Sequence, residues 1–330
     1  MIPVNSRVLV TGAAGFIGSF VASRLAQMGM SVTACDNFND YYSTDLKQTR
    51  VKAMLAPLGI DCETVELADA LQVRHLFERV RPAFVVHLAA QAGVRYSIEN
   101  PAAYVQSNLV AFANILEACR QFKPRHLVYA SSSSVYGASQ KAPFKESDIT
   151  DEPVSFYAAT KKANEALAYS YSHLFGIPAS GLRFFTVYGP WGRPDMAYFS
   201  FAQKILKGEA IPVFAKGELK RDFTYIDDIV EGIVRVLAKP ADAGAGTTPH
   251  MVFNIGNHQP VRVMDFIASL EEVLGVKAKL QFLPMQQGDV RITYADTSKL
   301  RDWVGFAPAT PLGEGLLRFR DWLAGWSTTR

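Results

Sequence analysis

The sequence is poor in cysteine, contains no long apolar segment and has no large excess of one charge. Its three cysteines, Cys35, Cys62 and Cys119, lie far apart without metal-site spacing, so we expect reduced thiols and no bound metal. The 34 basic and 31 acidic side chains leave a net charge of +3, which does not suggest a nucleic-acid surface. Residues 83–90, among the longest apolar runs, are too short to cross a bilayer, and the first residues do not resemble a signal peptide. We therefore expect a cytoplasmic protein with neither nucleic-acid nor membrane partners.

Apolar side chains are abundant, at 49% of 330 residues, and suffice for a large buried core. In the first half, short apolar runs alternate with longer amphipathic stretches, which is typical of an α/β fold with a doubly wound parallel sheet. From residue 188 onward this rhythm breaks, so we expect a smaller mixed α/β C-terminal lobe. The expected strands are 7–10, 31–36, 83–88, 126–130 and 179–184, and the expected helices are 16–28, 71–79, 102–120 and 157–175.

A glycine-rich turn joins the first expected strand to the first expected helix. Gly12, Gly15 and Gly18 follow one another at equal spacing in this turn. Glycines let the turn tighten and let the backbone approach a pyrophosphate, while the helix N-terminus offers unpaired N–H groups to the phosphates. A lone glycine pattern can be a simple turn, but the strand–turn–helix context that a dinucleotide site requires is present here.

Asp36 ends the second expected strand, about 20 residues after Gly15, as in dinucleotide-binding units. A carboxylate at this place accepts hydrogen bonds from a ribose 2′-hydroxyl and repels a 2′-phosphate, so it favours NAD over NADP. An aspartate at the end of a strand can also be a turn or cap residue, and the prediction therefore depends on the glycine turn beside it.

Tyr157 and Lys161 stand four residues apart on an expected helix and therefore share one face of it. A nearby ammonium favours the phenolate and lowers the pKa of a tyrosine toward the range in which it can act as a base. A serine run, residues 131–134, follows an expected strand at the sheet edge where substrates bind, although serine clusters are also common in caps and turns.

Together these motifs resemble the extended short-chain dehydrogenase/reductases, and in particular nucleotide-sugar 4-epimerases. The similarity spans nearly the whole chain. The resemblance implies that residues 1–182 form an NAD-binding Rossmann domain, to which segments near 225–257 return, and that residues 183–330 form a UDP-sugar-binding lobe. The segments that carry it are the glycine turn, Asp36, residues 87–90, the serine run, the Tyr157/Lys161 pair and residues 221–228.

The resemblance also implies roles for individual side chains. Tyr157 is expected to be the catalytic base, Lys161 to tune its pKa and Ser132 to bind at the sugar C4 oxygen, with Ser133 and Ser134 sharing substrate contacts. Asn108 is expected in a structural or proton-relay position, where a buried amide satisfied within the protein is the alternative. Glu66 and Asp69 are expected at the adenine edge. The residues expected to bind NAD are Gly12, Gly15, Phe16, Ile17, Gly18, Asp36, Asn37, Asp69, Leu88, Ala89, Ala90, Asn108, Tyr157 and Lys161.

The serine run also bears on the type of reaction. Dehydratases of the family that this chain resembles carry an acid/base pair just after the first hydroxyl residue of the serine-run position, and decarboxylating members carry a glutamate nearby. This chain has Ser133 and Ser134 at these positions. We therefore expect a 4-epimerase, in which hydride leaves C4, the 4-keto sugar rotates and hydride returns to the other face. A regulator that binds NAD without turnover would have lost Tyr157, Lys161 or their hydroxyl partner, so we expect an enzyme.

Residues 36–42, 91–97 and 188–197 resemble UDP-glucuronate 4-epimerases in particular. Within the last segment, Arg193 is expected to hold a sugar carboxylate through two hydrogen bonds, which a neutral hexose does not need. The alternative is a loop-stabilising ion pair with Asp195. Thr186 stands where many hexose epimerases have Asn, and its smaller hydroxyl side chain is expected to leave room for, or to bond, a carboxylate. Interconversion of UDP-glucuronic and UDP-galacturonic acid is therefore predicted, and the alternatives are epimerisation of neutral or acetamido UDP-hexoses and decarboxylation of UDP-glucuronate.

By the same resemblance, the C-terminal lobe is expected to hold the UDP group. Arg221 is expected at the diphosphate and Asp289 at the ribose. Relatives often have an arginine where Gln286 stands, so Arg95 and Lys204 are further candidates for the diphosphate. Val213 and Phe214 are expected either against the uracil or in the core. The resemblance further implies a homodimer built from helices 102–120 and 157–175.

Overall fold

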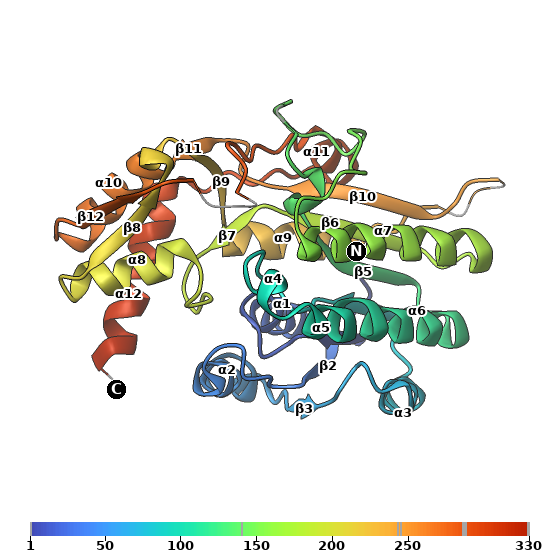
Figure 1. The fold of residues 1–330 in the computed structure, drawn as a ribbon. Coiled ribbons are helices and arrows are strands. Elements are labelled where there is room, and N and C mark those ends of the chain that lie inside the picture. Colours follow the sequence, from blue (N-terminus) through green and yellow to red (C-terminus); the bar gives the residue numbers. More distant parts are fainter. Residues whose placement is uncertain (1, 140, 243, 245, 286–288, 329–330) are drawn as a thin grey trace.

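A seven-stranded parallel sheet forms the centre of the computed structural model, which describes residues 2–139, 141–242, 244, 246–285 and 289–328 (Figure 1). The strand order is β10-β6-β5-β4-β1-β2-β3, and every neighbouring pair is parallel. This sheet confirms the predicted α/β, doubly wound fold. Its strands are β1 (Arg7–Thr11), β2 (Ser31–Asp36), β3 (Cys62–Thr64), β4 (Phe84–His87), β5 (His126–Ser132), β6 (Ala179–Phe184) and β10 (His250–Ile255).

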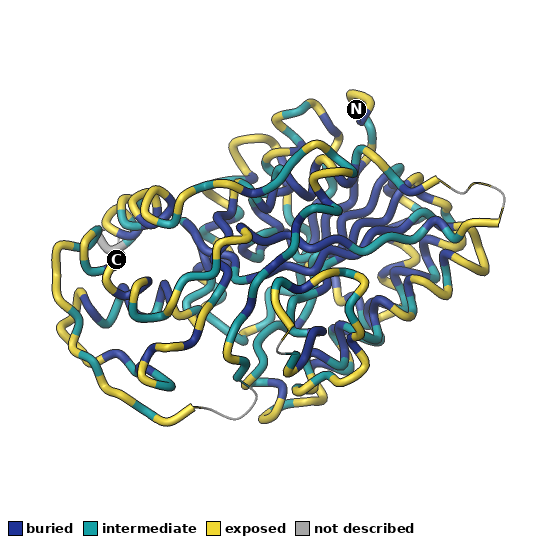
Figure 2. The backbone as a smooth tube through the Cα atoms, turned by 90° about the horizontal axis from the view of Figure 1, so that it is seen from above, coloured by how far each residue is buried: buried dark blue, intermediate teal, exposed yellow. Residues whose placement is uncertain are grey.

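Helices cover both faces of the sheet, which explains why the central strands are buried and consist mainly of apolar residues (Figures 1 and 2). Helices α1 (Phe16–Gln27) and α9 (Ile226–Leu237) pack on one face. Helices α3 (Ala70–Val80), α6 (Ala111–Phe122) and α7 (Phe156–Phe175) pack on the other.

The helix expected over residues 102–120 is interrupted. The structure has α5 (Pro101–Tyr104), then a π-helical turn η3 (Val105–Val110), then α6. Within η3, the main-chain carbonyl of Asn108 accepts a hydrogen bond from Asn164 on α7 at 2.7 Å. A side chain from a neighbouring helix that bonds a main-chain carbonyl commonly accompanies such an insertion, and periodicity of apolar residues does not reveal it.

The smaller lobe contains two short sheets and lies beside the carboxyl edge of the large sheet (Figure 1). One sheet has the order β11-β9-β7 and the other pairs β12 with β8. The strands are β7 (Thr186–Tyr188), β8 (Ala210–Phe214), β9 (Lys220–Tyr225), β11 (Pro260–Arg262) and β12 (Lys279–Leu283), and the helices are α8 (Ala197–Leu206), α10 (Val263–Leu274), α11 (Ser298–Val304) and α12 (Leu312–Thr328). The remaining helical segments are α2 (Thr44–Arg50), η1 (Val51–Leu55), η2 (Ala56–Leu58), α4 (Tyr96–Glu99), η4 (Ser133–Tyr136) and η5 (Ala215–Gly217).

Two kinds of feature are missing from the part of the chain that the structure describes. No helix there is long and apolar enough to span a membrane. The same residues contain no group of three or more His, Cys, Asp or Glu side chains arranged to hold a metal ion. The cysteines Cys35, Cys62 and Cys119 are present as free thiols.

Helix α7 is fixed to the sheet through a buried ion pair. Glu165 on α7 accepts hydrogen bonds from Arg183 on β6 through both carboxylate oxygens, each at 2.8 Å, and from Ser131 on β5 at 2.6 Å. The side chains of Arg183 and Glu165 are only 5% and 7% exposed. A carboxylate that accepts three hydrogen bonds is well compensated for the loss of water, so this helix has a defined register against β5.

We predict that Arg183→Met lowers the free energy of unfolding by about 3–5 kcal/mol, because it leaves the Glu165 carboxylate buried without a cation. Urea denaturation of the purified variant measures this loss. The matched control is Arg74→Met, which removes an exposed pair with Glu78 and is expected to cost less than about 1 kcal/mol. Equal effects of the two substitutions would contradict this role of the buried pair.

Candidate active site

One cavity of about 840 Å³ lies at the carboxyl ends of the parallel strands, between the large sheet and the smaller lobe. Its walls come from the turn after β1, the segments that follow β4 and β5, the start of β7, and the loop before α8. In open α/β sheets, ligands bind at this edge. The cavity therefore stands where the motifs of the sequence were expected to meet.

The glycine turn is built so tightly that side chains do not fit. Gly12 has a positive φ of 70°, and a Cβ atom there would lie 2.7 Å from the amide nitrogen of Ala89. A Cβ atom on Gly18 would lie 2.0 Å from the carbonyl oxygen of Gly12. Both residues line the cavity together with Gly15, Phe16 and Ile17 at the start of α1. The bare backbone and the free N–H groups of this helix end fit a dinucleotide pyrophosphate.

Asp36 lies at the cavity wall at the end of β2. Its carboxylate accepts main-chain hydrogen bonds from Ala14 at 3.2 Å and from Phe38 at 2.9 Å. These bonds hold it beside the glycine turn, where a carboxylate fits the ribose 2′-hydroxyl of NAD. Asn37 also lines the cavity and donates to Glu66 at 2.9 Å, and Glu66 lines the same region.

Two residues that were expected to contact NAD do not line the cavity. Asp69 caps helix α3 by accepting hydrogen bonds from the amides of Leu71 and Gln72, and these bonds lower the pKa of its carboxyl group. Asn108 is buried and uses its side-chain amide on both main-chain polar groups of Gln91 and on the Thr160 hydroxyl. Asn108 thus fixes the segment after β4, which is the structural alternative weighed from the sequence.

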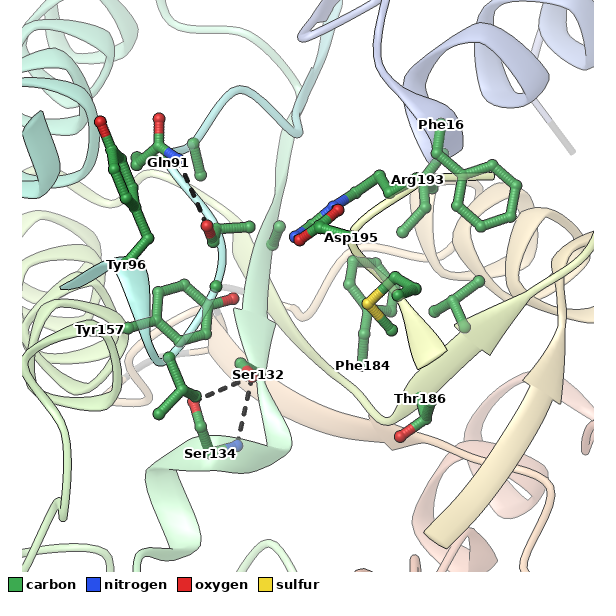
Figure 3. Close-up of a pocket in the computed structure, with 18 of the residues that line it drawn as sticks. Phe16, Gln91, Tyr96, Ser132, Ser134, Tyr157, Phe184, Thr186, Arg193 and Asp195 are labelled. Atoms are coloured by element: carbon green, nitrogen blue, oxygen red, sulfur yellow. Dashed lines mark hydrogen bonds and ion pairs between the residues drawn. The ribbon is translucent and has the colours of Figure 1, made fainter. Parts of the chain in front are cut away.

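Tyr157 and Ser132 lie on the same side of the cavity, as Figure 3 shows, and Lys161 lines this cavity as well. Ser155 caps α7 by accepting a hydrogen bond from the amide of Ala158, so the helix begins just before the tyrosine. Lys161 donates to the main-chain carbonyl of Ala130 at 2.9 Å. Its nitrogen lies 6.0 Å from the centre of the Tyr157 ring. The predicted pair therefore faces the end of β5.

The protonation of this pair depends on burial. Burial lowers the pKa of Lys161 to about 8, which still leaves most of the lysine charged at neutral pH. Burial also raises the pKa of Tyr157, and a hydrogen bond with Ser132 and the charge of Arg193 act in the opposite direction. The tyrosine is thus mainly protonated in the protein without ligand, and any cation that binds beside it favours the phenolate.

The four serines of the run have different surroundings. Ser131 points toward Glu165, whereas the hydroxyl of Ser134 donates to the hydroxyl oxygen of Ser132 at 2.9 Å, as Figure 3 shows. All four serines of the run line the cavity. No carboxylate follows Ser132 in this turn, so its neighbours offer hydroxyl groups alone.

Arg193 enters the cavity from the side opposite to Tyr157 (Figure 3). Its Nε donates to Asp195 at 3.0 Å and its Nη2 donates to the other oxygen of the same carboxylate. The hydroxyl of Tyr41 donates to Asp195 at 3.2 Å. The ion pair considered from the sequence is therefore present, and Arg193 lines the cavity as well. No role was assigned to Tyr41 from the sequence, although it stands in the segment 36–42 that resembles uronate epimerases.

Several of the expected nucleotide contacts line the same cavity. Arg221 and Asp289 both line it and pair with each other at 3.6 Å. Arg95 packs over the ring of Phe214, with 5.2 Å between the guanidinium carbon and the ring centre. Thr186, which was expected near the sugar carboxylate, also lines the cavity.

Val213 lies in the hydrophobic core and is 0% exposed, while its neighbours Pro212 and Phe214 line the cavity. Side chains alternate along a strand, so only one of two successive residues of β8 faces a ligand. Gln286 is outside the described residues, and Lys204 does not line the cavity among those that are described.

Comparison with known proteins identifies the family. A sequence profile of the NAD dependent epimerase/dehydratase family matches residues 8–256. The chain belongs to this family. Among its relatives, UDP-glucuronate 4-epimerase 3 of Arabidopsis thaliana is 49% identical over 330 residues, which is 97% of this chain and 76% of that protein. The probable UDP-glucuronate 4-epimerase of Rhizobium meliloti (strain 1021) is 45% identical over 328 residues, 96% of each protein.

A solved structure of the same family is also similar. The UDP-glucuronic acid 4-epimerase from Bacillus cereus, in complex with UDP-glucuronic acid and NAD, superimposes with a TM-score of 0.87. It is 33% identical in sequence and covers 97% of this chain and 99% of its own. The membership of the family agrees with the glycine turn and Asp36, which fit NAD.

We predict that Gly18→Ala weakens NAD binding by about ten-fold or more, because its Cβ would push α1 away from the glycine turn. The NAD content of the purified protein and a titration with added NAD measure this loss. Gly313→Ala is the matched control, because Gly313 lies in α12 with open space around it and alanine favours helix. If both variants retain NAD equally, NAD does not bind at the glycine turn.

Proposed function

We propose that this protein is an NAD-dependent 4-epimerase that interconverts UDP-glucuronic acid and UDP-galacturonic acid. The observation that carries the proposal is the position of Arg193, whose guanidinium faces the cavity across from Tyr157 and Ser132. A cation at this place fits a sugar acid better than a neutral sugar. The bound NAD would accept hydride from C4 of the sugar and return it to the opposite face.

The residues of this chain supply proton transfer and orientation. Tyr157 removes the proton of the C4 hydroxyl as hydride leaves and gives a proton back when hydride returns. Lys161 keeps a positive charge near the phenol, which favours the phenolate. Ser132, held by Ser134, bonds the C4 oxygen and keeps it within reach of Tyr157.

Arg193 has room for two carboxylates. Asp195 occupies the edge of the guanidinium formed by Nε and Nη2, so the edge formed by Nη1 and Nη2 remains for a ligand. Asp195 also fixes the direction of the guanidinium, since its carboxylate is itself held by a hydrogen bond from the Tyr41 hydroxyl. A sugar carboxylate bound at the open edge would hold C5, which discourages loss of CO₂ from the 4-keto intermediate.

The acidic residues of the cavity argue against the related reactions. Among the described residues that line it, the carboxylates are Asp36, Glu66, Asp195 and Asp289. Asp36 and Glu66 lie beside the glycine turn, and the other two pair with Arg193 and Arg221. None stands next to Ser132, so the acid/base pair that dehydration needs is not formed by these side chains. Epimerisation needs no carboxylate beside Ser132, because Tyr157 transfers the proton.

The proposal is tested by incubating the protein with UDP-glucuronic acid and no added NAD, and by following the products with proton NMR. We expect UDP-galacturonic acid, since NAD is regenerated in every cycle and stays bound. A UDP-pentose product would indicate decarboxylation, and turnover of UDP-glucose alone would indicate a hexose epimerase.

We predict that Arg193→Gln lowers kcat/KM for UDP-glucuronic acid by about 10- to 100-fold, the value of one or two charge-assisted hydrogen bonds. UDP binding should not change. The control is Arg262→Gln, because Arg262 forms a similar two-bond pair with Asp265 on the surface and does not line the cavity. Unchanged kinetics of Arg193→Gln would remove the argument for a sugar acid.

The proposal includes a homodimer formed through α6 and α7. Helix α7 exposes several large apolar side chains, among them Tyr169 at 53%, Leu174 at 65% and Phe175 at 46%. Apolar side chains gathered on one exposed helix support an interface, because contact with water is unfavourable for them.

A reducing compartment, the cytoplasm, is proposed as the location because the cysteines are free thiols.

We predict a dimer in light scattering after gel filtration and a monomer for Leu174→Glu. The control is Leu71→Glu on α3, because Leu71 is equally exposed at 65% but lies outside the proposed interface. A wild-type monomer, or a dimer that survives Leu174→Glu, would contradict an interface through α7.

A further inference from the structure

Arg50, the last residue of α2, is a fully buried cation, with 0% of its surface exposed. Its Nε donates to the main-chain carbonyl of Trp191 at 2.8 Å, and its Nη2 donates to that of Gly192 at 2.9 Å. Its Nη1 donates to the carbonyl of Ala14 at 3.1 Å and to the hydroxyl of Tyr42 at 2.7 Å. Within the described residues, these partners are neutral oxygen atoms and not a carboxylate.

A buried charge without an opposite charge is costly to fold, so its contacts need a reason. These contacts do not directly stabilise the large sheet, because Arg50 bonds none of its strands. It bonds two loops that border the cavity. One is the glycine turn, through Ala14, and the other is the loop before α8, through Trp191 and Gly192.

The second loop has a conformation that needs external support. Trp191 has a positive φ of 60°, which costs free energy for a residue with a large side chain. At Gly192, a Cβ atom would lie 1.4 Å from the hydroxyl oxygen of Tyr198, so the backbone is pressed against α8. The two carbonyls that Arg50 binds belong to these residues, and the next residue is Arg193.

We propose that Arg50 is a positioning residue that fixes the direction of Arg193 and couples the loop before α8 to the glycine turn. The inference rests on the proposed function, since it concerns the same sugar-acid site. The planar fork of Arg50 holds two successive carbonyls at once and reaches Ala14 with its third nitrogen. A lysine carries the same charge but donates from a single atom, so it cannot span these three carbonyls. A shift of the loop by about 1 Å is enough to misplace a ligand-binding group.

The test is a double-mutant cycle with Arg50→Lys and Arg193→Gln. Calorimetry measures the Kd of UDP-glucuronic acid and of UDP in a Tyr157→Phe background, in which the ligand is not converted. We expect Arg50→Lys to raise the Kd of UDP-glucuronic acid about ten-fold and to leave the Kd of UDP unchanged. In the presence of Arg193→Gln, the further effect of Arg50→Lys should fall to within about two-fold, because two residues that act through one contact are not additive.

The steady-state constants give a second readout. With Tyr157 present, a positioning role raises the KM of Arg50→Lys for UDP-glucuronic acid more than it lowers kcat, and the NAD content of the purified protein falls. Arg24→Lys is the control, because Arg24 is half exposed and pairs with Glu231 away from the cavity. If Arg50→Lys does not fold, Tyr42→Phe removes one of the four hydrogen bonds of Arg50 and is expected to show the same dependence on Arg193, at a smaller size.

The outcomes separate the two proposals. If the wild-type protein converts UDP-glucuronic acid but the effects of Arg50→Lys and Arg193→Gln simply add, the positioning role is overturned and the proposed function stands. Equal weakening of UDP and UDP-glucuronic acid by Arg50→Lys also overturns it, because that result describes a general loss of structure. If the wild-type protein neither converts nor prefers UDP-glucuronic acid, the proposed function itself fails.

Discussion

The positions of the catalytic side chains depend on one contact, the packing of α7 against the end of β5. Tyr157, Lys161 and Glu165 lie on one face of this helix because they are spaced four residues apart. Lys161 bonds the main chain at Ala130 and Glu165 bonds the next residue, Ser131. These two bonds set the helix in register with the strand, and Ser132 then follows beside Tyr157. The catalytic geometry is thus a consequence of a buried helix–strand contact.

The two halves of the cavity are held in different ways. The half that contains Tyr157 and Ser132 is built from the end of a central strand and from the face of α7 that packs on the sheet, so its geometry follows from the core. The half that contains Arg193 is a loop, and its shape depends on hydrogen bonds from Arg50 and on the Asp195 carboxylate. Loops placed on a rigid frame are where members of one fold family differ in specificity.

Local patterns in the sequence were enough to predict the parallel sheet and the glycine turn, because each depends on residues close together in the chain. The Tyr157/Lys161 pair says little as an isolated pattern, and its role was predicted from the resemblance that all the motifs carry together. The positions of Asp69, Asn108 and Val213 could not be obtained in this way. Asp69 is close in sequence to Glu66, which lines the cavity, but its carboxylate accepts hydrogen bonds from the first turn of α3. Val213 faces the core because successive side chains of β8 point to opposite sides. Asn108 bonds Gln91 and Thr160, which are far away in the chain.

The presence of Asp195 beside Arg193 raises the question of why a second carboxylate should bind there. Arg50 bonds this loop, and in the part of the chain that the structure describes its guanidinium donates to main-chain carbonyls and a hydroxyl and not to a carboxylate. Asp195 thus compensates one of two neighbouring guanidinium groups. A sugar carboxylate at the open edge of Arg193 would bring a second negative charge to the same place, whereas a neutral hexose would leave the excess positive charge as it is. Preference for a sugar acid then arises from both arginines together, and the buried charge of Arg50 has a use that offsets its cost.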